Sequence, residues 1–123
     1  MIKTSYLAKL KEIVHNEPDA VITIVSRGPL KPSAELLADF MNMKKLHEAR
    51  GLSEFEARKR AWNLVDYERR YRRHIMNLPE ALEQIRLIKE LDRKGKTIYL
   101  ICYEKEAPCH RFIVKDIVDK GEW

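Results

Sequence analysis

Short apolar runs, bounded by charged or turn-forming residues, mark the strands of this chain. Residues 20–26 (AVITIVS) and 97–102 (TIYLIC) are rich in β-branched side chains and almost continuously apolar. Such runs are typical of parallel strands that are buried on both faces. Residues 2–6 alternate in type, and they fit either a third short strand or the first turn of a helix that continues to Val14. The pattern predicts two strands and leaves the third open.

Helical periodicity fills the rest of the chain, and capping residues mark where four helices begin. Ser33 can cap the first helix, and Ser53 with Glu56 forms a capping box at the start of the second. Pro79 suits the first turn of the third helix, and the fourth follows Pro108. The predicted buried stripes are Leu36, Leu37, Phe40 and Met41; Ala61, Trp62, Leu64, Val65, Tyr71 and Ile75; Leu82, Ile85, Ile88 and Leu91; and Ile113, Val114, Ile117 and Val118.

The order strand, helices, strand, helix predicts an α/β fold, in which crossovers place helices on both faces of the sheet. We expect one domain over residues 1–123, with a small open, mainly parallel sheet of the Rossmann or flavodoxin-like kind and flanking helices. The helical segment between the two strands is longer than one crossover needs. We therefore interpret part of it as a long helical insertion that forms a flap or a dimer surface.

The composition is that of a globular protein. The chain has 123 residues, of which 45% are hydrophobic and 35% charged, and this fits a single core. No apolar run approaches the roughly 20 residues that cross a bilayer, so we expect no membrane association. Two cysteines cannot form a disulfide framework, and the first residues lack a signal-peptide pattern. We therefore expect a cytoplasmic protein.

The net charge of +5 favours an anionic partner. Residues 56–74 carry seven lysines and arginines against three acidic residues, with Trp62, Tyr67 and Tyr71 interleaved. A basic helix of this kind can follow a phosphate backbone and stack on bases, so one alternative is a nucleic-acid-binding accessory protein. The other interpretation is a solvated helix whose aromatic side chains face the core. Tyr67 and Tyr71 share one helix face, from which a phenol can reach over a pocket as a lid.

Polar and reactive side chains follow the predicted strands directly. In open parallel sheets, ligands bind beyond the carboxyl ends of the strands, so these side chains are expected to meet at one rim. Thr4 and Ser5 join the rim if residues 2–6 form a strand. The residues expected there are Ser26, Arg27, Cys102, Tyr103, Glu104, Lys105, Cys109, His110 and Arg111, together with Thr4, Ser5 and Tyr6 in the case of a third strand.

Cys109 is the first candidate nucleophile. It lies at the start of a predicted helix beside His110 and Arg111, an arrangement that lowers the pKa of a thiol. Cys102 is the second candidate, and either cysteine can instead be a small buried hydrophobe. Glu104 and His110 would act as acid–base groups or would orient their neighbours.

Arg27 and Arg111 predict an anion site. Two guanidinium groups near one helix start suit a phosphate or a carboxylate. In the alternative interpretation, each arginine pairs with an acid such as Glu104 as scaffolding. We therefore expect a phosphorylated or nucleotide-like small molecule as the ligand.

Three more specific motifs do not match this sequence. Cys102 and Arg111 are nine positions apart with no glycine between them, unlike the cysteine–arginine loop of phosphatases. Cys102, Cys109 and His110 supply at most three of the four ligands of a structural zinc site. Cys109 and His110 are adjacent and expected to point apart, so we expect no metal, and no other cofactor is indicated. The Cys-x6-Cys spacing differs from the Cys-x-x-Cys of thioredoxins, so a redox pair is the less favoured alternative.

The segment ICYEKEAPCHR resembles the Cys-x-Glu-Lys…Cys-His-Arg signature of the domain of unknown function 488 (DUF488) family. The opening IKTSYLAKL, the strand VITIVSRG and the segment DYERRYRRHI are similar to that family in the same order, whereas residues 43–63 match it poorly. The resemblance implies an α/β fold with a polar rim of Thr4, Ser5, Arg27, Cys102, Glu104, Cys109, His110 and Arg111. The residues leave two hypotheses: an enzyme or ligand-binding domain for a phosphorylated or nucleotide-like small molecule, in which Cys109 or Cys102 can act as a nucleophile, and a nucleic-acid-binding accessory protein that uses the basic helix.

Overall fold

The computed structural model describes residues 1–105 and 108–120, and three parallel strands form its sheet. The strands are β1 (Ile2–Tyr6), β2 (Val21–Ile24) and β3 (Ile98–Cys102), in the order β1-β3-β2. Leu100 of the central strand pairs with Thr4 on one side and Thr23 on the other. Residues 2–6 are thus a strand, which decides the alternative that the sequence left open.

Most of the helices lie between β2 and β3. The helices are α1 (Leu10–Asn16), α2 (Ala34–Ala49), α3 (Glu54–Leu64), α4 (Tyr67–Met76), α5 (Pro79–Arg93) and α6 (His110–Lys120), with two short 3-10 helices, η1 (Leu7–Lys9) and η2 (Gly28–Leu30). The predicted α/β class, with a small open parallel sheet, flanking helices and a long helical insertion, is confirmed. None of the described helices is both long enough and apolar enough to cross a membrane.

The predicted capping residues begin the helices. The Ser33 Oγ atom accepts a hydrogen bond from the Leu36 backbone N–H at 3.1 Å, and the Ser53 Oγ atom accepts one from the Glu56 N–H at 3.2 Å. Each bond satisfies an amide that has no partner within its helix. Pro79 is the first residue of α5, where its missing N–H costs nothing.

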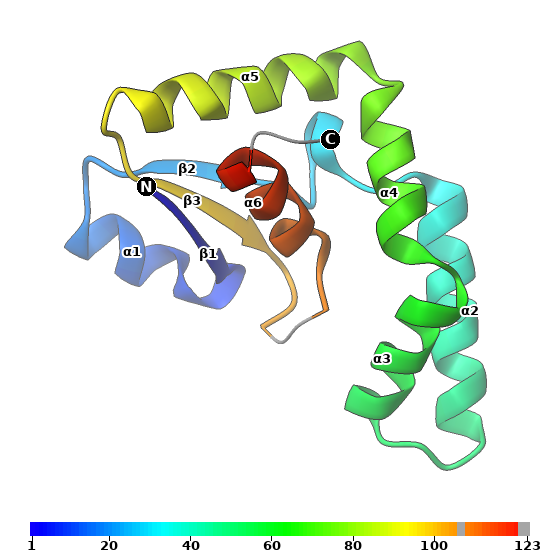
Figure 1. Ribbon diagram of the computed structural model, residues 1–123. Helices are drawn as coiled ribbons and strands as arrows, with labels where there is room; N and C mark the ends of the chain where they lie inside the picture. Colours follow the sequence, from blue (N-terminus) through cyan, green and yellow to red (C-terminus); the bar gives the residue numbers. More distant parts are fainter. Residues whose placement is uncertain (106–107, 121–123) are drawn as a thin grey trace.

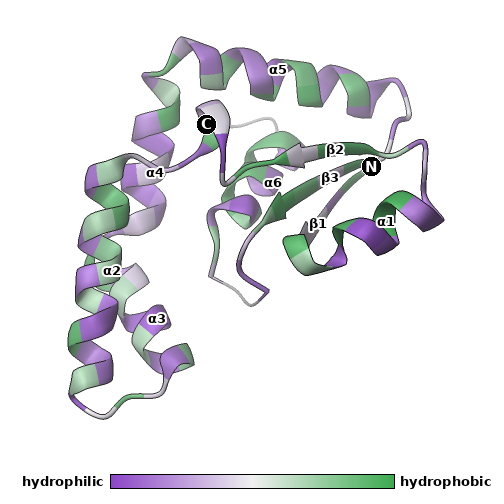
Figure 2. Cartoon of the chain, turned by 180° about the vertical axis from the view of Figure 1, so that it is seen from behind, coloured by the Kyte–Doolittle hydropathy of each residue, from purple (hydrophilic) through white to green (hydrophobic). Residues whose placement is uncertain are grey.

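The alternation of side chains along β3 divides the core between the two faces of the sheet. Ile98 and Leu100 pack in the larger cluster with α5 and α6, whereas Tyr99 and Ile101 pack with Ile13 of α1. Figure 1 shows α1 on one side of the sheet and α6 on the other. Figure 2 shows β2 and β3 as nearly continuous hydrophobic segments, while the helices alternate between the two kinds of residue. This placement brings the start of α6 to the end of β3.

The insertion extends beyond the carboxyl ends of the strands. In Figure 1, α2 and α3 run side by side to the right of the sheet, and α4 and α5 lead the chain back to β3. The α2–α3 pair therefore stands next to the edge at which ligands bind in open parallel sheets. It forms one wall of the site described below.

The structure corrects the basic helix expected over residues 56–74. The chain breaks there into α3 and α4, because Asp66 adopts a left-handed conformation with φ 55°. Leu64, predicted to be buried, ends α3 and is 63% exposed. The predictions for Leu37 and Met41 are also wrong: they are 45% and 38% exposed, because they face an open cavity.

Candidate functional site

Two cysteines lie at the carboxyl edge of the sheet, where β3 turns into α6. Cys102 is the last residue of β3 and pairs with Tyr6 of β1, while Cys109 directly precedes α6. Both are buried, and both are free thiols. The two Sγ atoms and one ring nitrogen of His110 lie within 4.8 Å of one another. The fold therefore brings both candidate nucleophiles close to His110, one of the two candidate acid–base residues.

His110 is held in one orientation by the chain after β2. Its Nε2 atom lies 2.8 Å from the Val25 carbonyl oxygen, which can only accept a hydrogen bond, so Nε2 carries the hydrogen. The Nδ1 atom faces both thiols, at 3.9 Å from Cys102 Sγ and 3.8 Å from Cys109 Sγ. In the neutral ring Nδ1 accepts a proton from a thiol, and in the cation it donates one to a thiolate.

The surroundings of the pair favour a thiolate on Cys102. A hydrogen bond from the Cys109 thiol lowers the pKa of Cys102 most, against the opposing effect of burial. The His110 ring and the Glu104 backbone N–H add to this, and together these groups bring the pKa of Cys102 to about 4. The nearby Cys102 sulfur and burial raise the pKa of Cys109 instead. Only one sulfur of the pair ionises, because two negative charges at this separation repel each other.

The pKa of Cys109 is thus raised, whereas its place in the sequence predicts that it is lowered. Its position before a helix predicts a lowered pKa, and the Arg111 backbone N–H does act in that direction. The hydrogen bond to Cys102 and the loss of solvent around the thiol outweigh this effect. Cys102 is therefore the better nucleophile of the two.

Arg111 shapes the loop between the cysteines. Its guanidinium group donates hydrogen bonds to the Glu104 carbonyl and, at 2.8 Å, to the Lys105 carbonyl. The side chain is only 2% exposed and also packs on Phe112. Arg27 is exposed and donates a hydrogen bond to the Tyr103 hydroxyl at 2.9 Å. Neither arginine is among the residues that line the cavity described next.

A cavity of about 190 Å³ opens above the cysteines. Leu37, Phe40 and Met41 come from α2, Arg58 and Trp62 from α3, Tyr67 from α4 and His110 from α6. The other lining residues come from the end of β3 and from the connections that lead from β2 to α2 and from β3 to α6. The lining residues are Ser26, Pro32, Leu37, Phe40, Met41, Arg58, Trp62, Tyr67, Cys102, Tyr103, Glu104, Cys109 and His110. The lining is mainly apolar with a few polar groups, as in typical small-molecule sites.

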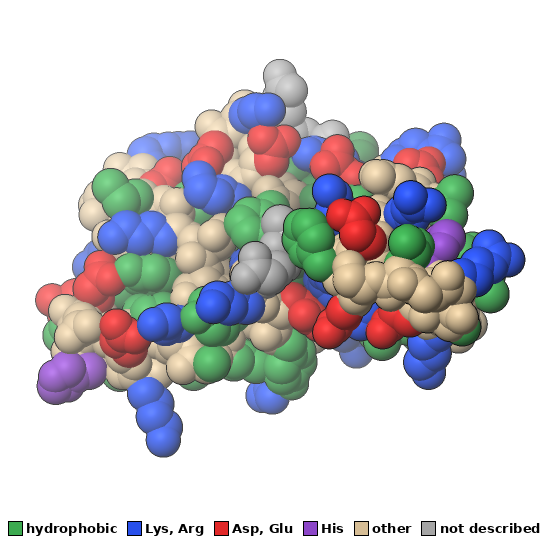
Figure 3. Space-filling model, turned by 90° about the horizontal axis from the view of Figure 1, so that it is seen from below, with side chains coloured by type: hydrophobic (Ala, Val, Ile, Leu, Met, Phe, Trp, Pro, Cys, Tyr) green, Lys and Arg blue, Asp and Glu red, His purple; other side chains and the backbone are tan. Residues whose placement is uncertain are grey.

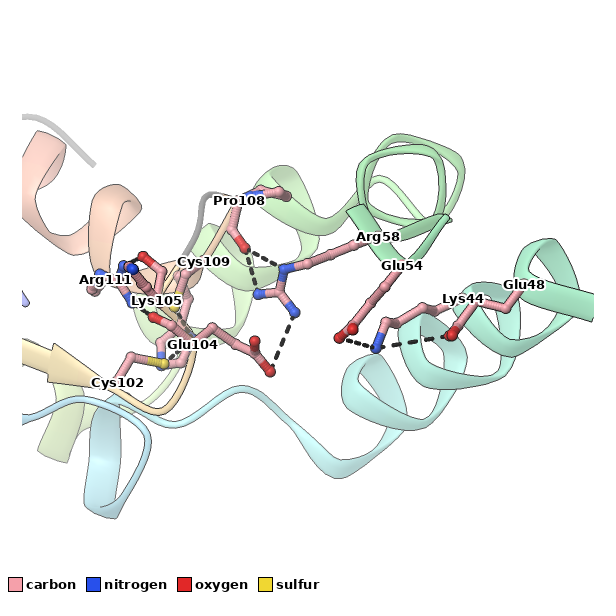
Figure 4. Close-up of polar contacts among 11 residues, drawn as sticks. Lys44, Glu48, Glu54, Arg58, Cys102, Glu104, Lys105, Pro108, Cys109 and Arg111 are labelled. Atoms are coloured by element: carbon pink, nitrogen blue, oxygen red, sulfur yellow. Dashed lines mark hydrogen bonds and ion pairs between the residues drawn. The ribbon is translucent and has the colours of Figure 1, made fainter. Parts of the chain in front are cut away.

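Arg58, which the sequence interpretation did not single out, joins α3 to the cysteine loop. Its Nε and Nη2 atoms donate to the Pro108 carbonyl at 3.0 and 2.5 Å, and its Nη1 atom lies 3.6 Å from the Glu104 carboxylate (Figure 4). The guanidinium also lies over the Phe40 ring, 5.4 Å from its centroid. A sequence signal exists, because Ala57 and Ala61 place Arg58 beside the buried stripe of its helix.

Aromatic side chains form the wall of the cavity. The Trp62 and Tyr67 rings stack with centroids 3.9 Å apart, and the Phe40 ring meets Tyr67 edge-on at 5.4 Å. Tyr71 lies behind this wall, where its hydroxyl donates to the Leu30 carbonyl at 2.7 Å. Its ring centroid is 5.3 Å from that of His110. Tyr67 and Tyr71 are thus part of the core, and they do not form a lid.

Two further polar groups face the cavity, whereas Thr4 and Ser5 do not line it. The Ser26 Oγ atom is buried and has no hydrogen-bond partner among the described residues. The Glu104 carboxylate lies between the cavity and solvent beside Arg58. Thr4 and Ser5 stay half-buried within β1, opposite Leu100 and Ile101 of β3.

The described part of the chain contains one group of His, Cys, Asp and Glu side chains that could meet at a metal ion. It consists of Cys102, Cys109 and His110. The expectation that Cys109 and His110 point apart is wrong. At the start of α6 both side chains turn inward, and the Cys109 Sγ atom lies 3.8 Å from the His110 Nδ1 atom. The group still supplies three ligands, one fewer than a structural zinc site.

Ion pairs and burial account for much of the basic segment. Arg69, Arg70 and Arg72 of α4 each form an ion pair with an aspartate. Tyr67 and Tyr71 are buried, so they offer no surface for stacking on bases. On the face seen in Figure 3, lysines and arginines are interspersed with acidic side chains. The local excess of positive charge is therefore largely balanced within the fold.

Comparison with known proteins gives one match. A family model described as the active DUF488-N3 subclade (DUF488-N3a) matches residues 6–122. Searches of curated proteins and of solved structures found no match. The matched residues include β2, β3 and the whole turn that carries Cys102 and Cys109. Because the match covers nearly the full chain, this protein belongs to the DUF488 family.

Proposed function

We propose that this protein is a cysteine-dependent enzyme that acts on a small phosphorylated or nucleotide-like molecule in the cavity. The observation that carries the proposal is the placement of His110, whose ring is held by the Val25 carbonyl with Nδ1 facing both thiols. These groups lie at the floor of a cavity that can hold a small molecule. The description of the matched subclade as active supports an enzyme.

Cys102 is the proposed nucleophile, and His110 handles the proton. The Cys102 sulfur donates an electron pair to an electrophilic carbon of the ligand, and the bond from that carbon to its leaving group breaks. The leaving group takes the proton from His110 Nδ1, which lies 3.9 Å from the sulfur. Water then attacks the same carbon and gives a proton to the neutral Nδ1, and the sulfur departs as a thiolate.

The rest of the cavity suits a ligand with a flat ring and an anionic group. Phe40, Trp62 and Tyr67 supply an apolar aromatic wall, while Arg58 supplies a buried positive charge. The Arg58 Nη1 atom is 3.6 Å from the Glu104 carboxylate, so an incoming anion competes with Glu104 for it. The unpartnered Ser26 hydroxyl offers one more hydrogen bond.

The pH dependence of alkylation tests the nucleophile. Reduced protein is treated with iodoacetamide over a range of pH, and peptide mass spectrometry quantifies the adduct on each cysteine. We expect the rate at Cys102 to fall only near its pKa of about 4, whereas an ordinary thiol slows below about 8.5. A Cys102→Ser variant removes this adduct. A rate at Cys102 that follows an ordinary thiol pKa overturns the proposal.

Protection against alkylation tests the ligand class. Adenosine monophosphate, adenosine and inorganic phosphate are compared as protectors at neutral pH. We expect adenosine monophosphate to slow alkylation of Cys102 in a saturable way and more strongly than either part alone. The Arg58→Met variant should lose the advantage of adenosine monophosphate over adenosine. Equal effects of the two compounds on the wild-type protein contradict an anionic ligand.

A further inference from the structure

The second thiol of the pair has no part in the proposed reaction beyond its hydrogen bond. Cys109 is 2% exposed, and its sulfur lies within 4.8 Å of the Cys102 sulfur. Both residues line the same cavity, so a small reagent reaches the pair through it. Six residues separate the two cysteines in sequence, yet the turn from β3 to α6 brings them together. The spacing that argued against a thioredoxin-like pair therefore does not keep the thiols apart.

The loop between the cysteines is anchored so that the two sulfurs stay close. Arg111 donates to the carbonyls of Glu104 and Lys105, just after Cys102. Arg58 donates twice to the Pro108 carbonyl, just before Cys109. Both ends of the loop are thus fixed to buried arginine side chains (Figure 4). A bond between the sulfurs needs an approach to about 2.05 Å, a short movement from a separation that is no more than 4.8 Å.

We propose that Cys102 is an oxidation site for small hydroperoxides and that Cys109 converts the oxidised Cys102 into a reversible disulfide. The disulfide removes the nucleophile of the proposed enzyme, so oxidation switches that activity off. The regulatory part rests on the proposed function, whereas the formation of the disulfide does not.

Two steps form the disulfide. The Cys102 thiolate attacks one oxygen of the hydroperoxide and the O–O bond breaks. The leaving alkoxide, or hydroxide from hydrogen peroxide, takes the His110 Nδ1 proton and departs as an alcohol or as water. Cys102 is then a sulfenic acid. The Cys109 sulfur attacks the Cys102 sulfur, the S–O bond breaks, and hydroxide leaves as water with the Cys109 proton. Two thiols lose two electrons and the hydroperoxide gains them. A dithiol reductant reverses the change.

Oxidation of Cys102 also prepares Cys109 to react. In the reduced protein, the hydrogen bond and the negative charge of Cys102 raise the pKa of Cys109. A neutral sulfenic acid removes that charge. The Arg111 backbone N–H and the Arg111 charge, which lower the pKa of Cys109, then act against burial alone. The second thiol therefore stays protonated until Cys102 has been oxidised.

Peroxide treatment of three proteins tests the proposal. Wild-type, Cys109→Ser and Cys102→Ser proteins are treated with hydrogen peroxide at neutral pH, and their masses are measured before and after dithiothreitol. We expect the wild-type protein to lose two hydrogens, to lose alkylation at Cys102 and to regain it with dithiothreitol. The Cys109→Ser variant should accumulate a sulfenic acid on Cys102 that dimedone traps. The Cys102→Ser variant should stay unmodified.

The result that overturns the proposal is a wild-type protein whose Cys102 reacts with dimedone as fully as in Cys109→Ser, with no loss of two hydrogens. Alkylation of the reduced protein separates this failure from that of the proposed function. A low-pKa alkylation profile without a disulfide defeats the redox proposal alone. An ordinary thiol profile with a disulfide defeats the proposed enzyme alone.

Discussion

The Nε2–H group of His110 donates a hydrogen bond to the Val25 carbonyl at 2.8 Å, which ties the first residue of α6 to the turn that follows β2. This bond selects the tautomer of the ring, because the carbonyl accepts and cannot donate. The other ring nitrogen faces the two thiols, at 3.8 and 3.9 Å. A single backbone contact thus sets the proton chemistry of the cysteine pair.

Replacement of His110 tests this relationship. A His110→Ala variant removes one of the groups that lower the pKa of Cys102, so we expect that pKa to rise and the alkylation profile to move to higher pH. The measurement is the rate of iodoacetamide reaction at Cys102 against pH. His15→Ala is the matched control, because His15 is exposed on α1. A profile that is unchanged in His110→Ala contradicts the role of the ring.

Replacement of Cys109 should raise the pKa of Cys102 more than replacement of His110 does. The Cys109 thiol makes the largest contribution to lowering the pKa of Cys102. Cys109→Ala removes that donor, whereas Cys109→Ser keeps a hydroxyl in its place. We therefore expect the pKa of Cys102 to rise clearly in the alanine variant and less in the serine variant, as measured by alkylation against pH. Equal profiles for the two variants would show that the hydrogen bond is unimportant.

Arg58 should stabilise the fold as well as the cavity. An Arg58→Met variant leaves the Pro108 carbonyl without two charged donors, which costs about 1–3 kcal/mol in the free energy of unfolding. Urea denaturation measures this loss. Arg60→Met is the control, because Arg60 is exposed on the same helix, and its change should stay within about 0.5 kcal/mol. Similar losses in both variants contradict the importance of the loop contact.

Local sequence signals predicted the parts of the fold that depend on local physics. The β-branched runs around Ile22 and Leu100 indicate strands because buried parallel strands have that composition. Ser33 and Ser53 indicate helix starts because their hydroxyls satisfy free amides. The meeting of Cys102 with His110 followed from topology, since both lie at the carboxyl edge of a parallel sheet.

The cavity wall was not predictable in the same way. Arg58 lies in a segment rich in charge, and although Ala57 and Ala61 place it beside the buried stripe of its helix, its partner becomes defined only when α3 packs against the loop at Pro108. Arg111 is the opposite case. Its place near the cysteines in sequence predicts an anion-binding residue, but its guanidinium group donates its hydrogen bonds to the loop carbonyls instead. In both cases, backbone carbonyls of the loop between β3 and α6 decide where the charge lies.

The break between α3 and α4 depends on one residue in a left-handed conformation. Asp66 has φ 55°, a region that costs most residues about 1–2 kcal/mol but that glycine and asparagine adopt readily. We expect Asp66→Asn to be close to neutral and Asp66→Val to be less stable than the wild type by about 1–2 kcal/mol. Urea denaturation of the two variants compares them directly. Equal stabilities would mean that the chain reaches this turn without the left-handed residue.

Replacement of Tyr71 tests whether its hydroxyl stabilises the fold or takes part in the chemistry of the site. Its hydroxyl donates to the Leu30 carbonyl at 2.7 Å in a fully buried position, and its ring lies behind the aromatic wall against His110. Tyr71→Phe keeps the ring and leaves that carbonyl without its donor, so we expect a loss of about 1–3 kcal/mol in the free energy of unfolding. The pH profile of Cys102 alkylation should stay unchanged, because the hydroxyl does not contact the thiols.

Tyr103→Phe is the control for that variant. The Tyr103 hydroxyl accepts its hydrogen bond from Arg27 at the surface, where water replaces a lost partner, so we expect a change below about 1 kcal/mol. A Tyr71→Phe protein that is as stable as Tyr103→Phe contradicts the structural role of the buried bond. A Tyr71→Phe protein whose alkylation profile moves would instead place the phenol among the groups that set the charge on Cys102. The two measurements therefore assign Tyr71 to the scaffold or to the chemistry of the site.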